Sequence, residues 1–519
     1  MSVKKHGGDP DLTAAYAEIS VWQERTAEAL VVVLMCVLPL FLTSERYFYL
    51  TRQKFVFFVA STCLIMYAVA AVWGARLLRD PRLPSRSGVF SVADCALLGF
   101  AGVTLLSAFL SPYREVANVW LGIQERFDGA VTQLLYVLVF FIVSRWYRPR
   151  TRDLALFAAS SVIVAGIGIL QFFGMDIFTL WPVHDERFIV ENYYDIFFRS
   201  TLGNVNIVST YVCAAVLLNG YFFVRTESTR PYLWLAASAL NFWLMDLAGS
   251  YSGRVGVAAA LVLTLPFVFE NKKYSGRFLI LCGSWVLVYA AHRLFYNLIA
   301  LGNGNPSRLL LYAAGLCLLL LSGFALLIWE KKKPGQNSGR NRKLGLIAAL
   351  LCVVLGVAGV EIAGRSGGGM IYELREIMHG NIQDSFATYR IHIWRNAMSV
   401  YSRHPFFGSG PDTFSFVFPE AAQGVVGEFY DKAHNEYLQI LICQGIFGLA
   451  CYLVFLAAIF VKAVKKAFSD PIIMAVSAAF AGYAAQAFFN ISLPIASQML
   501  WIFAGIIAGA ASRKPDVSL

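Results

Sequence analysis

Residues 344–363 read LGLIAALLCVVLGVAGVEIA, an apolar run that only Glu361 interrupts with a charge. A helix needs about 20 apolar residues to cross the roughly 30 Å hydrocarbon core of a bilayer. This stretch is therefore predicted to span a membrane. Its apolar residues are continuous rather than alternating, which favours a helix and excludes a strand of a transmembrane barrel.

Similar stretches recur along almost the whole chain of 519 residues, of which 58% are hydrophobic and only 14% charged. Soluble globular proteins carry about 25% charged residues, so this chain has too little polar surface to cover its apolar mass in water. We predict an all-α polytopic membrane protein with about 14 transmembrane helices. The predicted spans are 26–43, 54–75, 90–111, 128–146, 153–173, 202–224, 231–249, 252–269, 277–298, 309–329, 344–363, 436–461, 471–490 and 495–511.

The predicted organisation follows from the positions of the 43 lysines and arginines. These residues accumulate in loops that stay in the cytoplasm, and a cytoplasmic N-terminus places most of them there. The net charge of +11 is therefore explained by membrane topology, and we expect membrane lipid but no nucleic acid as a partner. The predicted parts are a cytoplasmic N-terminal segment (1–25), transmembrane helices 1–11 (26–363), a large extracytoplasmic loop (364–431), transmembrane helices 12–14 (432–512) and a cytoplasmic tail (513–519).

The nine cysteines all fall within or beside predicted spans. None lies in an outer loop where an oxidising compartment could pair it. The sequence contains no CxxC motif and no Cys/His cluster. We therefore expect neither a disulfide framework nor a structural zinc site.

Long loops of a membrane protein are where function is expected to reside. The longest predicted loop covers residues 364–431, and within it a helical pattern over 385–402 ends before Pro405. Arg390 and Trp394 are four residues apart, so they share one face of this predicted helix.

A second polar feature lies where the chain returns to the membrane, in the sequence DKAHNEYLQ of residues 431–439. Asp431 is a plausible N-cap, which would place His434 in the first turn of the following helix. The positive potential of a helix N-terminus disfavours imidazolium and lowers the histidine pKa, and nearby arginines act in the same direction. A neutral imidazole is what a general base requires.

A third polar feature is the very short predicted turn GSYSGR of residues 249–254, between two spans. A charged side chain costs roughly 2.5 to 3.5 kcal/mol at the bilayer centre, so Arg254 is expected to face the bundle interior or the outer surface with an anionic partner. That partner is either an internal group or a ligand. Arginine suits phosphate because its planar guanidinium donates two parallel hydrogen bonds.

Taken together, these motifs resemble the O-antigen ligase and polymerase superfamily, the membrane glycosyltransferases that use lipid-linked glycans. The resemblance covers about residues 110–460, and it rests on the order and spacing of the motifs rather than on any one of them. The motifs are Trp120-Leu121-Gly122, Arg126-Phe127-Asp128-Gly129, LGNVN at 202–206, GSYSGR at 249–254, Arg390-xxx-Trp394, HPFFGSGP at 404–411, His434-Asn435-xx-Leu438 and GIFGL at 445–449.

The resemblance implies a GT-C-like helical bundle that transfers a glycan from an undecaprenyl-pyrophosphate carrier to an acceptor hydroxyl, on the outer face of the bacterial inner membrane. The implied transfer is inverting and needs neither metal nor cofactor. The family's essential residues map by motif onto Arg254, Arg390 and His434. The two guanidiniums would hold the diphosphate, and His434 would orient or deprotonate the acceptor. Further candidates for donor or glycan contacts are Arg126, Arg199, Trp394 and Asn435.

The chain differs from the family pattern in having more predicted spans than usual and in the residues around Arg254, where Ser-Arg-Gly is more frequent. The first predicted outer loop, residues 44–54, contains Glu45 as its only acidic residue. Metal-dependent GT-C enzymes carry acidic residues in this loop, and a hard cation usually needs more than one oxygen ligand. No P-loop spacing occurs, which disfavours ATP-driven export.

Each candidate also has a simpler interpretation. His434 alone would fit a packed histidine at a helix end, Arg390 could pair with Asp384 or Glu436, and Arg254 could be an interfacial anchor. The alternative function is a transporter or flippase of lipid-linked oligosaccharide, which predicts an inverted repeat and charges at all membrane depths. Here the polar motifs gather at one face. The sugar stays open, and so does the acceptor, which is another lipid-linked glycan, a lipid A core or a different hydroxyl.

Overall fold

The computed structural model of the chain describes residues 10–79, 90–180, 198–299, 306–332, 338–366, 369–423, 429–467 and 470–512. Residues 1–9 of the predicted N-terminal segment and the predicted tail at 513–519 lie outside the described residues. Within the described ranges the chain is helical apart from loops and one small antiparallel pair of strands, in which Phe198 lies opposite Asn204.

The first half of the chain contains α1 (Pro10–Val32), the π-helical turn η1 (Val33–Val37), α2 (Leu38–Leu40), α3 (Leu50–Arg79), α4 (Val92–Leu110), α5 (Ala130–Trp146), α6 (Thr151–Phe172), β1 (Phe198–Arg199), η2 (Ser200–Leu202), β2 (Gly203–Asn204), α8 (Val205–Arg225) and α9 (Tyr232–Leu247). The second half contains α10 (Tyr251–Val268), α11 (Lys272–Ile299), α12 (Pro306–Lys332), α13 (Ser338–Ala363), η3 (Gly364–Ser366), α14 (Gly369–Met378), α15 (Arg390–Tyr401), α16 (Phe414–Val417), η4 (Glu420–Ala422), α17 (Glu436–Lys466), α18 (Pro471–Gln486), η5 (Ala487–Phe489) and α19 (Gln498–Ser512).

Nine helices within the described ranges are long and apolar enough to cross a membrane, as expected for an all-α polytopic membrane protein. They are α3, α4, α6, α8, α10, α11, α13, α17 and α18, the last extended by η5. Shorter apolar helices cover α5, α19 and residues Gly315–Glu330 of α12. Every predicted span overlaps a helix of the structure, including α1 with α2 and also α9. How many of them cross the membrane stays a prediction.

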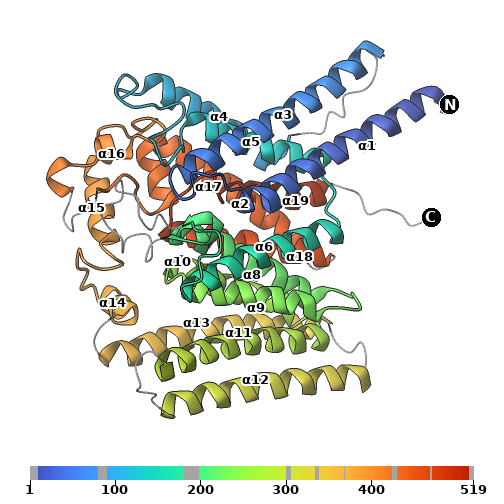
Figure 1. Ribbon diagram of the computed structural model, residues 1–519, viewed down its shortest axis with the longest axis vertical. Coiled ribbons are helices and arrows are strands. Elements are labelled where there is room, and N and C mark those ends of the chain that lie inside the picture. The colour runs from blue at the N-terminus through green and yellow to red at the C-terminus, as the bar shows by residue number, and fades with distance from the viewer. Residues whose placement is uncertain are drawn as a thin grey trace.

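The helices run side by side in one bundle, with α11, α12 and α13 along one edge (Figure 1). The start of α1 and the end of α19 lie at the same end of this bundle (Figure 1). The helices α14, α15 and α16, which belong to the predicted large loop, lie at the opposite end (Figure 1). The polar motifs of that loop are therefore gathered at one end of the membrane body.

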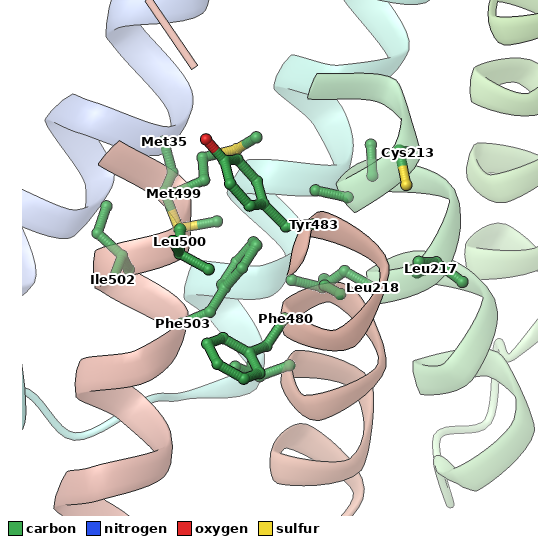
Figure 2. Packing of buried hydrophobic residues seen from close by; sticks show 14 of the residues in the cluster. Met35, Cys213, Leu217, Leu218, Phe480, Tyr483, Met499, Leu500, Ile502 and Phe503 are labelled. Carbon is green, nitrogen blue, oxygen red and sulfur yellow. The ribbon is translucent and has the colours of Figure 1, made fainter. Parts of the chain in front are cut away.

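The centre of the bundle is built from α8, α18 and α19. The most apolar window of α8 is completely buried, as expected for a helix that is hydrophobic on all sides. Figure 2 shows Phe480 and Tyr483 of α18 between Phe503 of α19 and Leu218 of α8. This close packing gives the loops at the end of the bundle a rigid base.

The helix α17 is broken at Gly445, where φ is +72°. The break frees the carbonyls of Ile442 and Cys443, and buried carbonyls need hydrogen-bond partners. The backbone N–H groups of Ser409 and Gly410 donate to these two carbonyls, at 3.0 and 2.9 Å. The loop motif HPFFGSGP therefore caps the part of α17 that precedes the break at Gly445.

The same loop motif also satisfies the helix on the other side of the break. The N–H of Ile446 donates to the carbonyl of Pro405 at 2.8 Å. A Cβ atom at Gly445 would overlap the carbonyl group of Phe406, so only glycine fits at this crossing. The HPFFGSGP and GIFGL motifs are thus two halves of one structural junction.

One predicted helix boundary is wrong. The predicted helix over residues 385–402 begins later, at Arg390, because Ala387, Thr388 and Tyr389 all have positive φ angles. Three successive residues in this conformation cannot continue a right-handed helix. The prediction that Arg390 and Trp394 lie on one helix is confirmed, and Arg390 is its first residue.

Candidate functional site

His434 lies directly before α17, at the end of the bundle that carries the loop helices. Its backbone φ is +49°, a conformation that residues other than glycine adopt rarely. Such residues are found preferentially at functional sites. Its ring is half-buried. The Nδ1 atom is buried and has no hydrogen-bond partner within the described part of the chain. One nitrogen of the ring therefore has no hydrogen-bond partner among the described residues.

The helix after His434 begins at Glu436, and its N-cap is Asn435, whose side-chain oxygen accepts an N–H of the first turn at 3.1 Å. The prediction that Asp431 is the N-cap is wrong. Asp431 instead forms an ion pair with Arg126 at 2.7 Å. His434 therefore lies just outside the first turn, and Asn435, predicted as a substrate contact, has a capping role.

The pKa of His434 is lowered to about 3. Close enclosure by the protein is the largest cause, and the positive charge of Arg390 is the next. Arg126 and Lys432 lower the pKa further, while Asp431 opposes them. The predicted direction agrees with this result, although burial contributes more than the helix N-terminus on which the prediction was based. The imidazole is neutral around pH 7, as a general base must be.

Arg390 lies at the start of α15 with its guanidinium beside His434. Its Nη1 donates to the carbonyl of Ala387 at 3.0 Å, and its Nε is buried without a hydrogen-bond partner. Burial lowers the pKa of Arg390. No carboxylate of the described residues forms an ion pair with it. An enclosed cation without a counter-ion is costly, so a bound anion would stabilise this arrangement.

The two carboxylates that could have paired with Arg390 are occupied by other groups. Asp384 pairs with Arg395, on the exposed side of α15. Glu436 accepts a hydrogen bond from Tyr452 at 2.5 Å inside the bundle. The interpretation of Arg390 as an ordinary ion-pairing residue is therefore not what the structure shows.

Trp394, one helical turn after Arg390, connects α15 to the chain beside His434. Its Nε1 donates to the carbonyl of Ala433 at 2.9 Å, which fixes the peptide next to His434. Its ring packs edge-on against Phe488, with the ring centres 5.4 Å apart. The structure therefore brings four predicted residues together: His434, Arg390, Trp394 and Arg126.

Arg254 belongs to a different cluster. It lies in the first turn of α10, and its Nη2 donates to the Asp246 carboxylate at 2.8 Å. The Nε2 of His292 lies 3.8 Å from the other oxygen of the same carboxylate. Arg254 thus has an internal anionic partner, and the described contacts do not include one with His434 or Arg390.

The two clusters are nevertheless joined by one short connection after α18. Phe489 in η5 packs against Trp394, with ring centres 6.0 Å apart. The next residue, Asn490, donates to the hydroxyl of Ser252 at 3.1 Å, two residues before Arg254. The turn that carries Arg254 and the face of α15 that carries Arg390 therefore contact the same segment.

Arg199 is placed apart from both groups. It is in the small strand β1, and its guanidinium lies over the ring of Phe172 at 5.8 Å from the ring centre. A cation above an aromatic face is a stabilising contact. Residues 181–197, which precede β1, lie outside the described residues.

A buried ion cluster beside His434 was not predicted. Lys432 is 1% exposed, and its Nζ lies 2.9 Å from Asp128 and 2.6 Å from Asp412. Burial alone would lower the pKa of Lys432, but the two carboxylates raise it above its usual value. Asp412 also accepts the N–H of Ile123 at 2.8 Å. The cluster ties together three segments that are far apart in the sequence.

A small cavity of about 30 Å³ lies next to this cluster, within the bundle. Asp128, Asp412 and Glu436 contribute to its wall. Tyr136 and Gln444, which also border it, each have a buried side-chain oxygen without a hydrogen-bond partner in the described structure. The cavity is large enough for one or two water molecules and too small for a sugar.

No group of three or more His, Cys, Asp or Glu side chains in the described part of the chain is arranged to hold a metal ion. All nine cysteines are free thiols.

The comparison with known proteins points to one family. The sequence profile of the O-antigen ligase family matches residues 304–453. This segment includes α15, the HPFFGSGP loop, His434 and the first part of α17. The match supports the O-antigen ligase and polymerase superfamily and a glycosyltransferase-like role. No curated protein sequence matches the chain.

The ion cluster makes a prediction about stability. Replacing Lys432 by Met leaves Asp128 and Asp412 buried without a cation, and breaking such a buried pair costs about 3 to 5 kcal/mol. Thermal unfolding of the purified protein in detergent should therefore show a clearly lower midpoint for Lys432→Met. The exposed Lys343→Met is the control and should unfold like the wild type. Equal midpoints for Lys432→Met and the wild type would show that the cluster does not hold these segments together.

Proposed function

We propose that the chain, whose residues 304–453 match the sequence profile of the O-antigen ligase family, is a glycosyltransferase that moves a glycan from an undecaprenyl-pyrophosphate carrier to an acceptor hydroxyl. One observation carries the proposal: a neutral, partly accessible His434 lies beside the Arg390 guanidinium, which has no carboxylate partner among the described residues. A general base and a site for an anion are the two groups that such a transfer needs.

The proposed role of Arg390 is to bind the diphosphate of the donor. A guanidinium donates to phosphate oxygens through two parallel hydrogen bonds, and its charge is permanent. Negative charge grows on the diphosphate as the bond to the sugar breaks, so a fixed cation stabilises the transition state more than the ground state. The enclosed position of Arg390 strengthens this effect, because the surrounding dielectric is lower than that of water.

Arg254 is proposed as a second contact for the diphosphate. Its described hydrogen bonds use only Nη2, which binds Asp246. A guanidinium has five N–H donors, so Arg254 can bind Asp246 and a phosphate oxygen together. Arg126, whose Nε is bound to Asp431, is proposed to contact the donor or the glycan in the same manner. Trp394 and Asn435 are proposed to support the site by holding the chain around His434. Arg199, which lies apart from it, is proposed as a more distant contact for the glycan.

The proposed role of His434 is to accept the proton of the acceptor hydroxyl. The hydroxyl oxygen then forms a bond to the anomeric carbon, while the bond between that carbon and the diphosphate breaks and its electron pair stays on the diphosphate. Attack from the face opposite the leaving group inverts the configuration. Because the pKa of His434 is low, the imidazolium gives up its proton readily to the diphosphate or to water.

The proposed location is the outer face of the bacterial inner membrane, and the mechanism is proposed to need no metal. The site lies at one end of a bundle of apolar helices (Figure 1), where a lipid-linked donor can present its diphosphate. The acceptor would be a second lipid-linked glycan in a polymerase, and a lipid A core or another hydroxyl in a ligase. The geometry of His434 and Arg390 serves both reactions equally.

Removal of the proposed base, His434, should abolish glycan transfer. The variant His434→Ala should insert into the membrane normally and lose glycan transfer by about 100-fold or more, as expected for removal of a general base. The matched control is His404→Ala, because the His404 ring packs against Tyr113 with the ring centres 6.3 Å apart and forms no described hydrogen bond or ion pair with His434 or Arg390. Transfer can be followed as consumption of a purified lipid-linked donor. Wild-type transfer by His434→Ala would exclude the proposed base.

The rate of transfer should depend on pH through the protonation of His434. Only neutral His434 accepts a proton, so kcat/KM should fall on the acid side near the pKa of His434, which is about 3 in the wild type. The positive charge of Arg390 helps to lower this pKa, so Arg390→Met should move the acid limb to higher pH. Arg390→Lys keeps the charge and should leave the limb nearer its original position, although the rate falls without the forked donor. Identical acid limbs in the three proteins would contradict the coupling.

A further inference from the structure

The helix α14 has its polarity reversed relative to a surface helix in water. Its apolar face consists of Met370, Ile371, Leu374 and Met378. These four residues are 40% to 46% exposed, whereas the side chains of Arg375, at the edge of this face, and Glu376, on the other face, are 24% and 13% exposed. A helix on a water-facing surface buries its apolar side and exposes its charges. The surroundings outside α14 are therefore apolar.

The charged face of α14 is held against the end of α13 by ion pairs. The Nε of Arg375 lies 3.3 Å from the carboxylate of Glu361, and the Nε2 of His379 lies 2.8 Å from it. Arg365 contacts the same carboxylate at 3.3 Å. A Cβ at Gly364 would approach the side chain of Arg375 to within 2.7 Å, which shows how closely α14 packs on this turn. These contacts fix the rotation of α14, so its apolar face cannot turn inward.

The apolar face of α14 continues a surface that faces lipid. The most apolar window of α13 has no buried residue, and Leu355 and Ile362 of this helix are 67% and 71% exposed. The turn η3 continues directly from α13 and contacts α14. A helix with exposed apolar residues along its length is stable only in a bilayer. The apolar face of α14 therefore lies at the edge of the same bilayer.

The opposite face of α14 is connected to Arg390. The carboxylate of Glu373 accepts the N–H of Ala387 at 2.9 Å, and the carbonyl of Ala387 accepts a hydrogen bond from Arg390 at 3.0 Å. The ring of Tyr372 packs edge-on against Phe386, with ring centres 6.3 Å apart. The depth at which α14 lies is thus transmitted to the turn that places the guanidinium.

We propose that α14 is an interfacial helix seated with its apolar face in the bilayer surface, and that Glu373 uses this seating to hold Arg390 at the depth of the lipid headgroups. The occupant of the apolar face is lipid. Helices of this kind lie in the membrane plane with the apolar face in the boundary between headgroups and acyl chains. The diphosphate of a lipid carrier lies at that depth. The link to Arg390 rests on the proposed function, whereas the seating in lipid does not.

The seating is tested by photo-crosslinking of the full-length protein in nanodiscs of phosphatidylethanolamine and phosphatidylglycerol. The photoreactive residue p-benzoylphenylalanine is placed at Leu374 and, as a matched control on the other face of the same helix, at Glu376. Leu355 of α13 is the reference for a lipid contact. Mass spectrometry should detect phospholipid adducts at Leu374 and Leu355 and none at Glu376. A crosslink from Leu374 to a second copy of the chain, or equal lipid labelling at Leu374 and Glu376, would overturn the proposal.

The link to Arg390 is tested with Glu373→Met, which removes the acceptor of the Ala387 N–H, combined with the same crosslinker at Leu374. The expected result is unchanged lipid labelling at Leu374 and a loss of transfer of about 10-fold or more, because a small displacement of a catalytic group is costly. The value of kcat should fall more than KM rises. Wild-type transfer with lipid labelling retained would overturn the link to Arg390. These outcomes are distinguishable from failure of the proposed function, which would appear as full transfer by His434→Ala.

Discussion

The break of α17 at Gly445 is the constraint on which the site depends. A straight helix would satisfy its own carbonyls and offer nothing to the outer loop. Because the helix breaks, the carbonyls of Ile442 and Cys443 bind the backbone of Ser409 and Gly410. Unpaired backbone groups are very costly in an apolar bundle. These hydrogen bonds therefore fix the loop firmly to the membrane helices.

The docked loop then fixes His434. Asp412 follows the loop motif directly and binds Lys432, which lies two residues before the histidine. Asp128 binds the same amino group from the start of α5, and Trp394 holds the peptide of Ala433. Three other segments of the chain thus converge on the short stretch that contains Lys432 and Ala433. This convergence accounts for the positive φ of His434, which the surrounding contacts over-determine.

The electrostatics of Arg390 and His434 are mutually consistent. Arg390 has no carboxylate partner in the described structure, and its charge disfavours protonation of His434. A carboxylate beside Arg390 would neutralise the site for an anion and would raise the pKa of the histidine. The structure instead uses Asp384 for Arg395 and Glu436 for Tyr452. The positive charge of Arg390 is therefore not neutralised by either carboxylate at the proposed diphosphate site.

The sequence was sufficient to predict the membrane class, the approximate positions of the membrane helices and the shared helix of Arg390 and Trp394, whereas the grouping of these residues with His434 was implied by the family resemblance. The first three features depend on local composition and on helical spacing, which a single sequence contains. The N-cap of α17 was predicted wrongly because Asp431 and Asn435 are both good caps, and the choice is made by Arg126 from a distant loop. Hydropathy could not supply that contact.

Other features could not be predicted because they are contacts across the fold. Lys432 pairs with Asp128 across about three hundred residues of sequence, and nothing local marks either residue as a partner. Arg254 was expected to have an anionic partner, but the sequence did not identify Asp246. The inverted polarity of α14 also required its exposure, because an amphipathic pattern does not state which face is turned outward.

Arg390 is proposed to bind the diphosphate of the donor, and a direct binding measurement tests this role. Native mass spectrometry of the purified protein with a farnesyl diphosphate probe would compare the wild type with Arg390→Met and with Arg395→Met, a change on the exposed side of the same helix. Loss of hydrogen bonds to a charged group should weaken binding about 10-fold or more in Arg390→Met, and Arg395→Met should bind as the wild type does. Equal affinity of Arg390→Met and the wild type would contradict the account.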